Sequence, residues 1–553
     1  MKKLLQILLF IPLIIRAQET YEITYTSFDD NPKEYKIYYQ NDVLYSSKPD
    51  DKIQYFTDFK NKRNVSILKY NDSLYSYIIP FSDLPKPIEV KDNTNEKIAG
   101  YKCKYVKYNY FSNSVEIWYT EKAKAKGSLY SRFTPTENAL VLKIRYNGND
   151  NVQVKSIKKA KPEFDLIYNI DKAKQVNQAR FEELKINSRY KIIPVFSSDT
   201  VNFDPNIKTI SREQIQNNVT YHFSNGNILL KKIKLTQELK EDNYIFVKFT
   251  EQSNGDAYDR SGSIFLIPGS QKLSIVDACI DSLGVLPVYK ANDEQEYQGI
   301  ITAGKYKPPI ELMRFFTPFG VGNFNEKRPI NNYNWEKQVV YKQEITDLIP
   351  KQEDEVWIGV FIGNYDKGGH IVSLELDVYP GENKTDSTKI NYIQPLFSTV
   401  NVMEAEGQNY GKLFRTDTLK MEFEIPENTS DLKLLYTSTG HGGWETGDEF
   451  IPKLNQIFID DKEIFKIIPW RTDCATYRLY NPASGNFSNG ISSSDLSRSN
   501  WCPGMLTPQE IVYLQNIKSG KHTLKVIIDQ GENQGNAFSH WQVSGVLVGD
   551  FLK

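Results

Sequence analysis

The chain has 553 residues, enough for two to four domains that each bury a core. Its 68 basic and 69 acidic residues give a net charge of -1 and are interspersed, so they make no electrostatic case for nucleic acid or a membrane surface as a partner. With 35 Tyr and 29 Phe, and recurring segments rich in Ile, Val and Thr, the sequence indicates a mainly β protein.

Residues 1–17 have the three zones of a secretory signal peptide. Met1–Lys3 is basic, Leu4–Ile15 is apolar except for Gln6 and Pro12, and the stretch ends on the small residue Ala17. We expect cleavage after Ala17 and a secreted or periplasmic protein. The apolar stretch is shorter than the ~20 residues that span a bilayer and no later segment approaches that length, so no membrane span is expected.

Residues 18–168 alternate short strands with turns and predict an antiparallel β domain. Tyr35–Tyr39 and Val115–Tyr119 are two such strands, and their alternating polar residues predict a sheet with one face in water. Residues 169–192 form the expected linker. From Asp171 to about Lys185 its composition favours a helix.

Three segments of this first domain resemble the GLPGLI family of secreted β proteins. They are Ala99–Lys104, Trp118–Thr120 and Ala139–Ile144. The function of that family is poorly defined, so the resemblance implies a domain but no activity.

Strand signals resume near Ile193 and continue to the end of the chain. Short strands separated by turn clusters favour β-sandwiches or jelly rolls over a parallel sheet. The turn at Pro380–Lys384 marks the expected boundary between a first jelly roll, 193–383, and a second, 384–553.

The chain has four cysteines, and export permits disulfides. Cys474 and Cys502 are close in sequence within one polar, Gly-rich region, so we expect them to pair. Cys279 stands between Ala278 and Ile280, which are the surroundings of a small buried hydrophobe.

The run Gly255–Gly262 is the most informative candidate site. It places Asp259 and Arg260 in a polar turn before an apolar strand, at a sheet edge where loops meet ligands. We count Asp256 and Tyr258 of the same run among the expected substrate contacts. Clusters of Asp, Gly and Ser also form ordinary solvated turns, so the run gains its weight from the rest of the chain.

Several segments, taken in order, resemble the bacterial peptide-N-glycosidase F family, the amidases that remove N-linked glycans from asparagine. They are Asp259–Arg260, Arg314–Gly322, Gly407–Lys412, Thr439–Gly442 and Arg498–Met505. The W-C-P-G-M stretch that ends the last segment is the most specific. Their shared order over about 250 residues argues against coincidence.

The resemblance implies two eight-stranded jelly rolls side by side, with the core chitobiose of the glycan in the cleft between them. It implies that Asp259 is the essential acid, Arg260 the adjacent sugar-contacting arginine and Glu449 the carboxylate of the second roll. Three further residues would line the cleft: His441, Arg498 and Trp501. The expected reaction hydrolyses the bond between asparagine and the innermost GlcNAc, which leaves Asp and releases a glycosylamine.

A pair of acids suits this chemistry. Amide hydrolysis at neutral pH needs an activated water and help for a poor nitrogen leaving group. Two carboxylates in one cleft push their pKa values apart, so that one stays ionised while the other is protonated or hydrogen-bonded.

Ordinary structural explanations stay open for these residues. Glu449 also suits the charged start of a strand, and Glu445 is a rival for its role. Arg498 would otherwise be a solvated loop charge, and His441 a turn residue near positive φ. Trp501 is as well placed to cover the neighbouring disulfide as to stack on a sugar.

The chain also departs from the family pattern. Gly255 replaces a cysteine before the first acid, and Gly447 and Ile451 flank the second acid where the family has cysteines, so these loops lack the family's short disulfides. Val360–Asn364, where a further active-site glutamate is expected, holds no carboxylate. Phe319–Gly320 has one aromatic where the family has a pair, which suggests a wider pocket that admits glycans decorated at the core.

Other classes of function fit less well. The five histidines form no His-x-His pair and no cluster at ligand spacing, so we expect no metal and no cofactor. A non-catalytic carbohydrate-binding secreted protein on the same fold is the alternative. The expected partners are N-linked glycoproteins and glycopeptides, and the expected state is a monomer.

Overall fold

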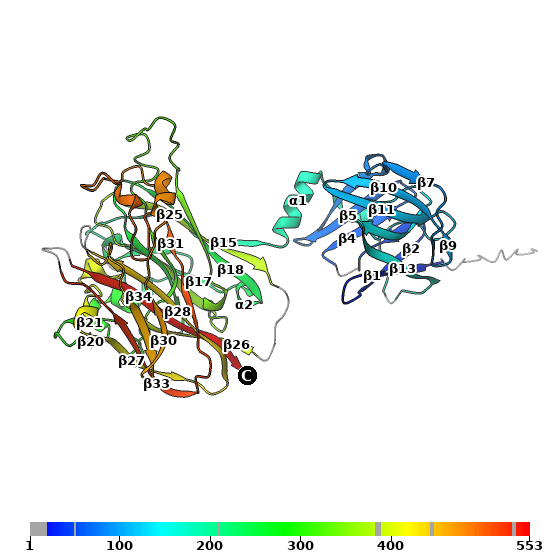
Figure 1. Cartoon of the computed structure of the whole chain (residues 1–553). Helices are drawn as coiled ribbons and strands as arrows, with labels where there is room; N and C mark the ends of the chain where they lie inside the picture. The colour runs from blue at the N-terminus through cyan, green and yellow to red at the C-terminus, as the bar shows by residue number, and fades with distance from the viewer. Residues whose placement is uncertain are drawn as a thin grey trace, which may run out of the picture. The chain divides into compact units, whose positions relative to one another are not determined.

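The computed structural model describes residues 19–48, 51–162, 164–207, 210–381, 389–442, 447–533 and 538–552. The expected signal peptide and Glu445 lie outside these ranges. The chain divides into two compact units, Met1–Arg189 and Tyr190–Lys553. Strands dominate both units, which confirms the mainly β class (Figure 1). Within the ranges given, no helix is both long enough and apolar enough to cross a membrane.

The first unit is built on a single twelve-stranded sheet in the order β14-β6-β5-β4-β3-β2-β1-β13-β12-β11-β10-β7. All its pairs are antiparallel except β14 with β6. Its strands are β1 (Tyr21–Ser27), β2 (Glu34–Gln40), β3 (Val43–Tyr45), β4 (Ile53–Asp58), β5 (Arg63–Tyr70), β6 (Ser73–Pro80), β7 (Glu89–Lys91), β10 (Lys104–Tyr110), β11 (Asn113–Thr120), β12 (Leu140–Tyr146), β13 (Asn149–Lys159) and β14 (Lys174–Gln175). A separate small hairpin consists of β8 (Lys97–Ile98) and β9 (Tyr101–Lys102).

The prediction of one wet face is wrong for the β2–β5 part of this sheet. Ile37 belongs to the main core on one face, whereas its neighbour Tyr38 is buried in a second cluster with Phe56 and Val65. Successive side chains of a strand point to opposite faces, so both faces are covered here. The cover on the second side is the segment after β13, through side chains such as Phe164.

The expected helix begins later than predicted. Helix α1 spans Gln178–Asn187, because Asn177 caps its N-terminus by accepting a hydrogen bond from the backbone N–H of Arg180 at 2.9 Å. Phe181 and Leu184 are buried against Leu68 of β5. The helix is therefore docked on the first unit's own sheet.

The second unit begins with a sandwich of a four-stranded and a six-stranded sheet, in the orders β15-β25-β18-β23 and β16-β17-β24-β19-β22-β31. Its strands are β15 (Lys191–Val201), β16 (Thr220–Phe223), β17 (Ile228–Lys234), β18 (Asn243–Ser253), β19 (Ser261–Pro268), β22 (Ile310–Phe316), β23 (Val339–Glu344), β24 (Glu355–Ile362), β25 (His370–Pro380) and β31 (Leu506–Thr507). Strand β31 comes from the second half of the chain, so this sandwich has more strands than the eight implied by the resemblance. The second half of the sequence thus contributes a strand to the edge of the first sandwich.

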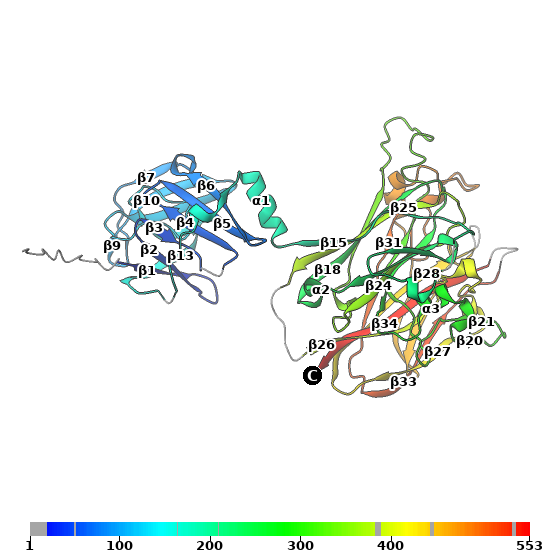
Figure 2. The same ribbon diagram turned by 180° about the vertical axis from the view of Figure 1, so that it is seen from behind.

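The second sandwich has two four-stranded sheets, β26-β34-β28-β32 and β27-β33-β29-β30. Its strands are β26 (Lys389–Ser398), β27 (Leu419–Ile425), β28 (Thr429–His441), β29 (Asn455–Ile459), β30 (Lys462–Ile467), β32 (Glu510–Tyr513), β33 (Gly520–Ile528) and β34 (His540–Leu552). The remaining elements of this unit include α2 (Gln237–Lys240), α3 (Ile275–Ile280), β20 (Val288–Lys290) and β21 (Glu296–Gln298). The sandwiches lie side by side within the unit (Figures 1 and 2).

Arg314 on β22 joins the two sandwiches through a buried ion pair. Its side chain is fully buried, and Nε and Nη2 donate to the two oxygens of Glu311 at 2.7 Å each. Its Nη1 donates to the hydroxyl of Thr439 on β28 at 3.1 Å and to the carbonyl of Gln542 on β34 at 2.9 Å. One guanidinium therefore satisfies groups from both sandwiches.

Replacing Arg314 by alanine is expected to lower the free energy of unfolding of the second unit by about 3–5 kcal/mol, because it leaves the buried Glu311 carboxylate without its cation. Urea unfolding followed by tryptophan fluorescence measures this, since six of the seven tryptophans lie in the second unit. Arg328→Ala, at an exposed position of the same sandwich, is the control. Equal stability of both variants would contradict the bridging role.

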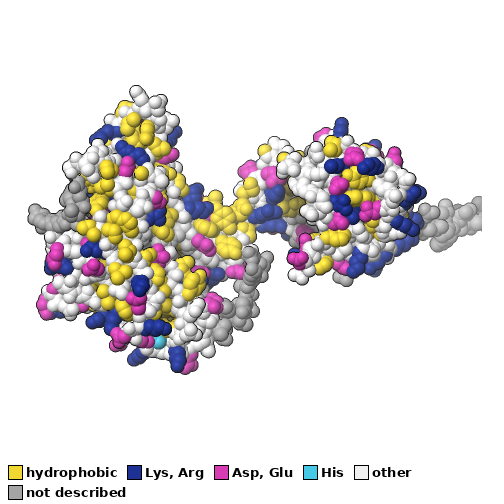
Figure 3. Space-filling model, viewed as in Figure 1, with side chains coloured by type: hydrophobic (Ala, Val, Ile, Leu, Met, Phe, Trp, Pro, Cys, Tyr) yellow, Lys and Arg dark blue, Asp and Glu magenta, His cyan; other side chains and the backbone are white. Residues whose placement is uncertain are grey.

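The charged side chains show no separation by sign on the face that Figure 3 presents. Lys and Arg lie interspersed with Asp and Glu over both units there. This distribution agrees with the balanced composition, and this face shows no patch of one charge that would mark a binding surface.

Candidate active site

A polar cavity of about 250 Å³ lies where the two sandwiches meet. Strand β19 begins there, β22 and β24 end there, and the end of β28 faces them. Its lining residues are Asp259, Arg260, Ser261, Phe316, Gly363, Tyr365, Glu404, Tyr410, His441, Gly442, Glu449, Trp501, His540 and Gln542. Five of these residues were expected from the sequence, and the most distant two, Asp259 and Trp501, are 242 positions apart: Asp259, Arg260, His441, Glu449 and Trp501.

The two candidate acids bind the same nitrogen of Arg498. Arg498 Nη1 lies 2.7 Å from Asp259 Oδ2 and 2.9 Å from Glu449 Oε1. The arginine side chain is 1% exposed and each acid is 18% exposed, so the acids reach the cavity while their shared cation lies behind them. Asp259 comes from the first sandwich and Glu449 from the second, so folding of the unit brings them together.

Backbone hydrogen bonds fix both acids in place. Asp259 lies two residues before β19, and its neighbour Arg260 is paired with Thr317, whose hydroxyl accepts from Arg260 N at 2.8 Å and whose N–H donates to Arg260 O at 2.9 Å. Glu449 N donates to Gly442 O at 3.3 Å, and Glu449 O accepts from Ser499 N at 2.9 Å. The second acid is thereby tied to the loop that carries Arg498.

The loop of Arg498 is held at several points. Arg498 exchanges backbone hydrogen bonds with Arg471 at 2.8 and 3.1 Å, and its Nη2 donates to the carbonyl of Ser493 at 2.7 Å. The predicted disulfide between Cys474 and Cys502 is present and ties the same two stretches together. These contacts hold the guanidinium of Arg498 in one place, so that both acids can bind it.

The environment moves the titration of both acids in the same direction. Burial raises the pKa of Asp259, against the opposing charge and hydrogen bond of Arg498. Burial likewise raises the pKa of Glu449 to about 7, with Arg498 opposing the shift and the charge of Asp259 adding to it. Because the acids interact, they titrate as a pair. The pair therefore changes charge near neutral pH.

His441 ends strand β28, and Gly442 takes the positive φ of 93° that follows. The structure thus decides between the alternatives for His441, which is a strand residue paired with His540 of β34. Its Nε2 lies 2.9 Å from the hydroxyl of Thr439, and its ring stacks on His540 with centroids 4.9 Å apart. Burial lowers the pKa of His441 well below its usual range, so the ring is neutral.

Trp501 packs against the guanidinium of Arg498. Its ring is 4% exposed, stacks on Phe316 with centroids 4.2 Å apart, and has the guanidinium carbon of Arg498 4.4 Å from its centroid. Its indole N–H donates to Gly440 O at 3.0 Å, and its backbone carbonyl oxygen lies 3.5 Å from the disulfide sulfur of Cys474. So little exposed ring leaves scant surface for a sugar to stack on.

The run around Asp259 divides into exposed and buried residues. Arg260 lines the cavity and Tyr258 is 62% exposed, with its ring 5.1 Å from the Arg260 guanidinium. Asp256, counted from the sequence as a substrate contact, is instead buried at 1% exposure and does not line the cavity. It accepts from Arg260 Nε at 2.7 Å. Asp256 therefore positions Arg260, and the sequence pattern of a solvated turn gave no sign of this burial.

Sequence reasoning missed a third carboxylate in the cavity. Glu404, from the 3-10 turn Glu404–Glu406, reaches the place beside Gly363 where the family's further glutamate was expected, and a Cβ on Gly363 would lie 3.0 Å from Glu404 Oε1. Burial raises the pKa of Glu404, while hydrogen bonds from Tyr410, Asn401 and Tyr365 oppose the shift. The only sequence signal was its place three residues before the family-like segment that contains Tyr410.

The expectation of a wider pocket gains no support at Phe319–Gly320. Neither residue lines the cavity, Phe319 is buried, and a Cβ at Gly320 would meet Phe324 at 2.5 Å. The glycine there serves packing, together with its positive φ of 70°. The admission of core-decorated glycans stays a prediction from the resemblance.

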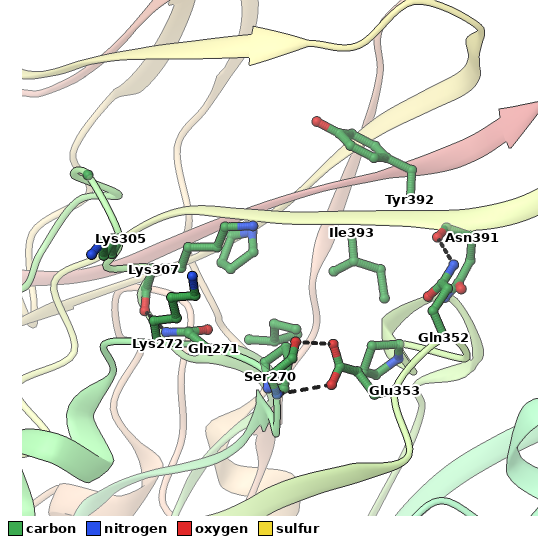
Figure 4. A pocket seen from close by; sticks show the side chains of 15 residues that line it. Ser270, Gln271, Lys272, Lys305, Lys307, Gln352, Glu353, Asn391, Tyr392 and Ile393 are labelled. Carbon is green, nitrogen blue, oxygen red and sulfur yellow. Dashed lines mark hydrogen bonds between the residues drawn. The ribbon is translucent and has the colours of Figure 1, made fainter.

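A larger cavity of about 450 Å³ lies at the other ends of β19, β22 and β24 (Figure 4). Three exposed lysines, Lys272, Lys305 and Lys307, lie on one side of it. Its one carboxylate, Glu353, accepts hydrogen bonds from the N–H and hydroxyl of Ser270. The smaller cavity brings together Asp259, Glu449 and Glu404, whereas the larger one has a single acid that is already hydrogen-bonded, so we place the candidate active site in the smaller cavity.

The second unit is thus a double β-sandwich protein with a cleft in which two acids contact one buried arginine. Acids whose environments shift their pKa values in this way are typical of acid–base sites. The models described as Peptide-N-glycosidase F, N terminal and C terminal, match residues 192–378 and 409–548. Residues 20–184 match the model described as N-glycanase peptide, N-terminal domain. The chain belongs to the peptide-N-glycosidase F family, as its sequence motifs predicted, and carries the additional N-terminal domain.

Solved structures of PNGF-II are similar over nearly the whole chain. One, in space group P21, is 38% identical with a TM-score of 0.79, over 96% of this chain and 99% of that one. Another, in space group C2, is 39% identical with a TM-score of 0.75, over 97% and 99%. Among curated relatives, Peptide-N(4)-(N-acetyl-beta-D-glucosaminyl)asparagine amidase F of Elizabethkingia miricola is 25% identical over 217 residues, 38% of this chain and 55% of that relative. That match spans only about half of the relative's length.

Proposed function

We propose that this protein hydrolyses the amide bond between asparagine and the innermost GlcNAc of N-glycans, leaving an aspartate and releasing the glycan as a glycosylamine. The observation that carries the proposal is the contact of Asp259 and Glu449, from two sandwiches, with one nitrogen of Arg498. Membership of the family, and the activity printed in the name of the curated amidase relative, support the same reaction class.

In the proposed mechanism Asp259 moves the proton. Its carboxylate accepts a proton from a water molecule while the water oxygen attacks the carbon of the asparagine side-chain amide. The protonated Asp259 then returns that proton to the nitrogen as the C–N bond breaks. The peptide keeps the new carboxyl group, and the sugar leaves with the amine. Glu449, on the same arginine nitrogen, orients the water.

The two arginines set the electrostatics of this step. Arg498 favours the ionised form of both acids, and a carboxylate must be ionised to accept a proton. Arg260 lines the cavity and donates to Asp256 through Nε and Nη2. We assign it to binding sugar or amide oxygen next to the reacting bond.

The test is incubation of the protein with an N-glycopeptide, followed by mass spectrometry of the peptide. Conversion of the glycosylated asparagine to aspartate is the expected result, and in H₂¹⁸O the new carboxyl carries the heavy oxygen. A peptide that keeps one GlcNAc would identify an endoglycosidase instead. Binding with no product would favour the alternative of a carbohydrate-binding protein.

We assign Glu404 a part in this site as the third carboxylate. Glu404→Gln keeps the size and the hydrogen-bond acceptor but removes a charge that interacts with Arg260. We expect kcat/KM for a glycopeptide to fall about 10-fold, the scale of one charge-assisted hydrogen bond. Initial rates by liquid chromatography measure this. Glu406→Gln, exposed and two residues away, is the matched control, and a parallel loss in both variants would remove the assignment.

We also propose that the chain acts after export. The sequence of residues 1–17 supports this, since it has the zones of a signal peptide. The Cys474–Cys502 disulfide supports it as well, because disulfides persist in oxidising compartments.

A further inference from the structure

A buried chain of charged side chains leads from the core of the first sandwich to Arg260. Glu251 of β18 and His370 of β25 are both fully buried, and His370 Nδ1 lies 2.7 Å from Glu251 Oε1. His370 Nε2 lies 3.6 Å from Asp256 Oδ2, whose side chain is 1% exposed. The same Asp256 oxygen accepts from Arg260 Nε at 2.7 Å. Of these four side chains, only that of Arg260 reaches the cavity.

The strand pattern places these charges inside the sheet. Along β18 every second residue is buried, and Glu251 shares the inward face with Phe249 and Ser253. His370 opens β25 opposite Ser253 in the register of the two strands. The alternation along β18 favours an apolar side chain at the position of Glu251. An acid buried there costs free energy unless it is paired. His370 supplies the pairing.

Backbone contacts already hold the loop that carries Asp256. Asn254 N donates to Gly369 O at 2.8 Å, and the Ser253 hydroxyl donates to Asp256 O at 2.6 Å. Gly369 has a positive φ of 61°, and a Cβ there would lie 2.1 Å from the Val201 carbonyl. The loop is thus tied to the turn before His370 without help from the side-chain charges. Buried ion pairs add little net stability, so these charges call for another explanation.

The charges along this series of four side chains alternate in sign. Burial alone would lower the pKa of His370, but contacts with Asp256 and Glu251 outweigh it and raise the pKa to about 9. Burial would raise the pKa of Asp256, yet its contacts with His370 and Arg260 lower it to about 2. Burial raises the pKa of Glu251, with His370 opposing. Tyr341 of β23 also faces Glu251, and burial keeps its hydroxyl protonated.

We propose that Glu251, His370 and Asp256 form a positioning relay that fixes the guanidinium of Arg260 in the cleft for substrate binding. An imidazolium between two carboxylates holds Asp256 in one orientation, and Asp256 presents two oxygens to Nε and Nη2 of Arg260. Without the imidazolium, Asp256 keeps Arg260 as its one cationic partner but loses the charge behind it, so the carboxylate and the guanidinium can shift together and Arg260 can turn toward the charges of Asp259 and Glu404. The relay rests on the proposed function only for its effect on substrate.

The charge state of His370 is tested without any substrate. Proton-nitrogen NMR of the full chain with ¹⁵N-labelled histidine should show an imidazolium signal of His370 at pH 7.5 that titrates near pH 9. His370→Gln should remove this signal, and Glu251→Gln should shift its titration to lower pH by at least about one unit, since one of its two acids is lost. A neutral His370 at pH 7.5 would overturn the relay, whatever the activity of the protein.

The positioning role is tested by kinetics on an N-glycopeptide. We expect His370→Gln to raise KM about 10-fold with kcat changed less than about 3-fold, the pattern of lost binding in ground and transition states alike. In an Arg260→Ala background the same substitution should add no further loss, because the arginine it positions is gone. His222→Gln, on β16 of the same sandwich, is the matched control. Thermal unfolding confirms that each variant is folded.

Each outcome of the kinetic test decides one question. A loss that is equally large with and without Arg260 would overturn the relay and leave His370 a structural residue. If His370→Gln fails to fold, Glu251→Gln replaces it in the same double-mutant comparison, because it keeps the shape of the side chain. Absence of product from the unchanged protein would instead count against the proposed function, and the NMR result would still decide the relay.

Discussion

Replacing Asp259 by asparagine is expected to lower kcat/KM for an N-glycopeptide by about 100-fold or more, the contribution of a positioned general base. Asparagine has nearly the same size as aspartate. In the unchanged protein Arg498 Nη1 lies 2.7 Å from the Asp259 carboxylate, and the amide oxygen of asparagine still accepts this hydrogen bond. The amide cannot take a proton from water at neutral pH. The variant therefore removes the proton transfer and leaves the geometry of the cleft.

The measurement is the initial rate of aspartate formation, with glycopeptide binding by calorimetry as a second readout. Binding within a few-fold of the unchanged protein, together with the rate loss, would assign Asp259 to the chemical step. Asp281→Asn is the control, because Asp281 is an exposed acid of the same unit that pairs with Arg212. Full activity of Asp259→Asn would sink the mechanism and turn attention to Glu449.

The members of the site that lie in short motifs were predictable from the sequence. Asp259 precedes an apolar strand and has a basic neighbour, and the strand is present as β19. Cys474 and Cys502 share one polar region, and they form a disulfide. In these cases the signal is local, because a turn before a strand or two cysteines in one loop region constrain each other over short distances.

The contacts between distant residues did not follow from local patterns, and the meeting of Asp259, Glu449 and Arg498 in one cleft was implied only by the family resemblance. Asp259 and Arg498 are 239 positions apart, and nothing near either residue specifies the other. Asp256 has the local pattern of a solvated turn, and its burial depends on His370, which belongs to another strand of the sheet. Glu404 fills a place that the local sequence at Gly363 leaves empty. Such contacts are set by how the sandwiches pack, which a single sequence does not encode in any one segment.

Arg498 is the residue on which these long-range contacts converge. Its Nη1 contacts both acids, its Nη2 donates to Ser493, and its plane lies over Trp501. A buried cation of this kind is costly to place, and it is stable here because two carboxylates face it. The arginine in turn allows two acids to lie close together at neutral pH, which repulsion would otherwise prevent.

Replacing Arg498 by glutamine is therefore expected to move the pH profile as well as the rate. In the unchanged protein kcat/KM should fall as the pH drops through about 7, because Glu449, with a pKa raised to about 7, and Asp259 together take up a proton and the base is lost. Arg498 lowers the pKa of both acids, so its removal raises them. The acid limb should move to higher pH by about 1–3 units.

At pH 7.5 this shift leaves most of the acid pair protonated, and kcat/KM should fall by about 100-fold, with partial recovery as the pH is raised. Rates between pH 5 and 10 give the profile. Arg415→Gln, an exposed arginine of the second sandwich that pairs with Glu532, is the control and should keep the original limb. A uniform loss of rate with the limb unmoved would mean that Arg498 only holds its loop. An upward shift of the limb would show that one guanidinium sets the charge of both acids, which is the condition for Asp259 to act as a base.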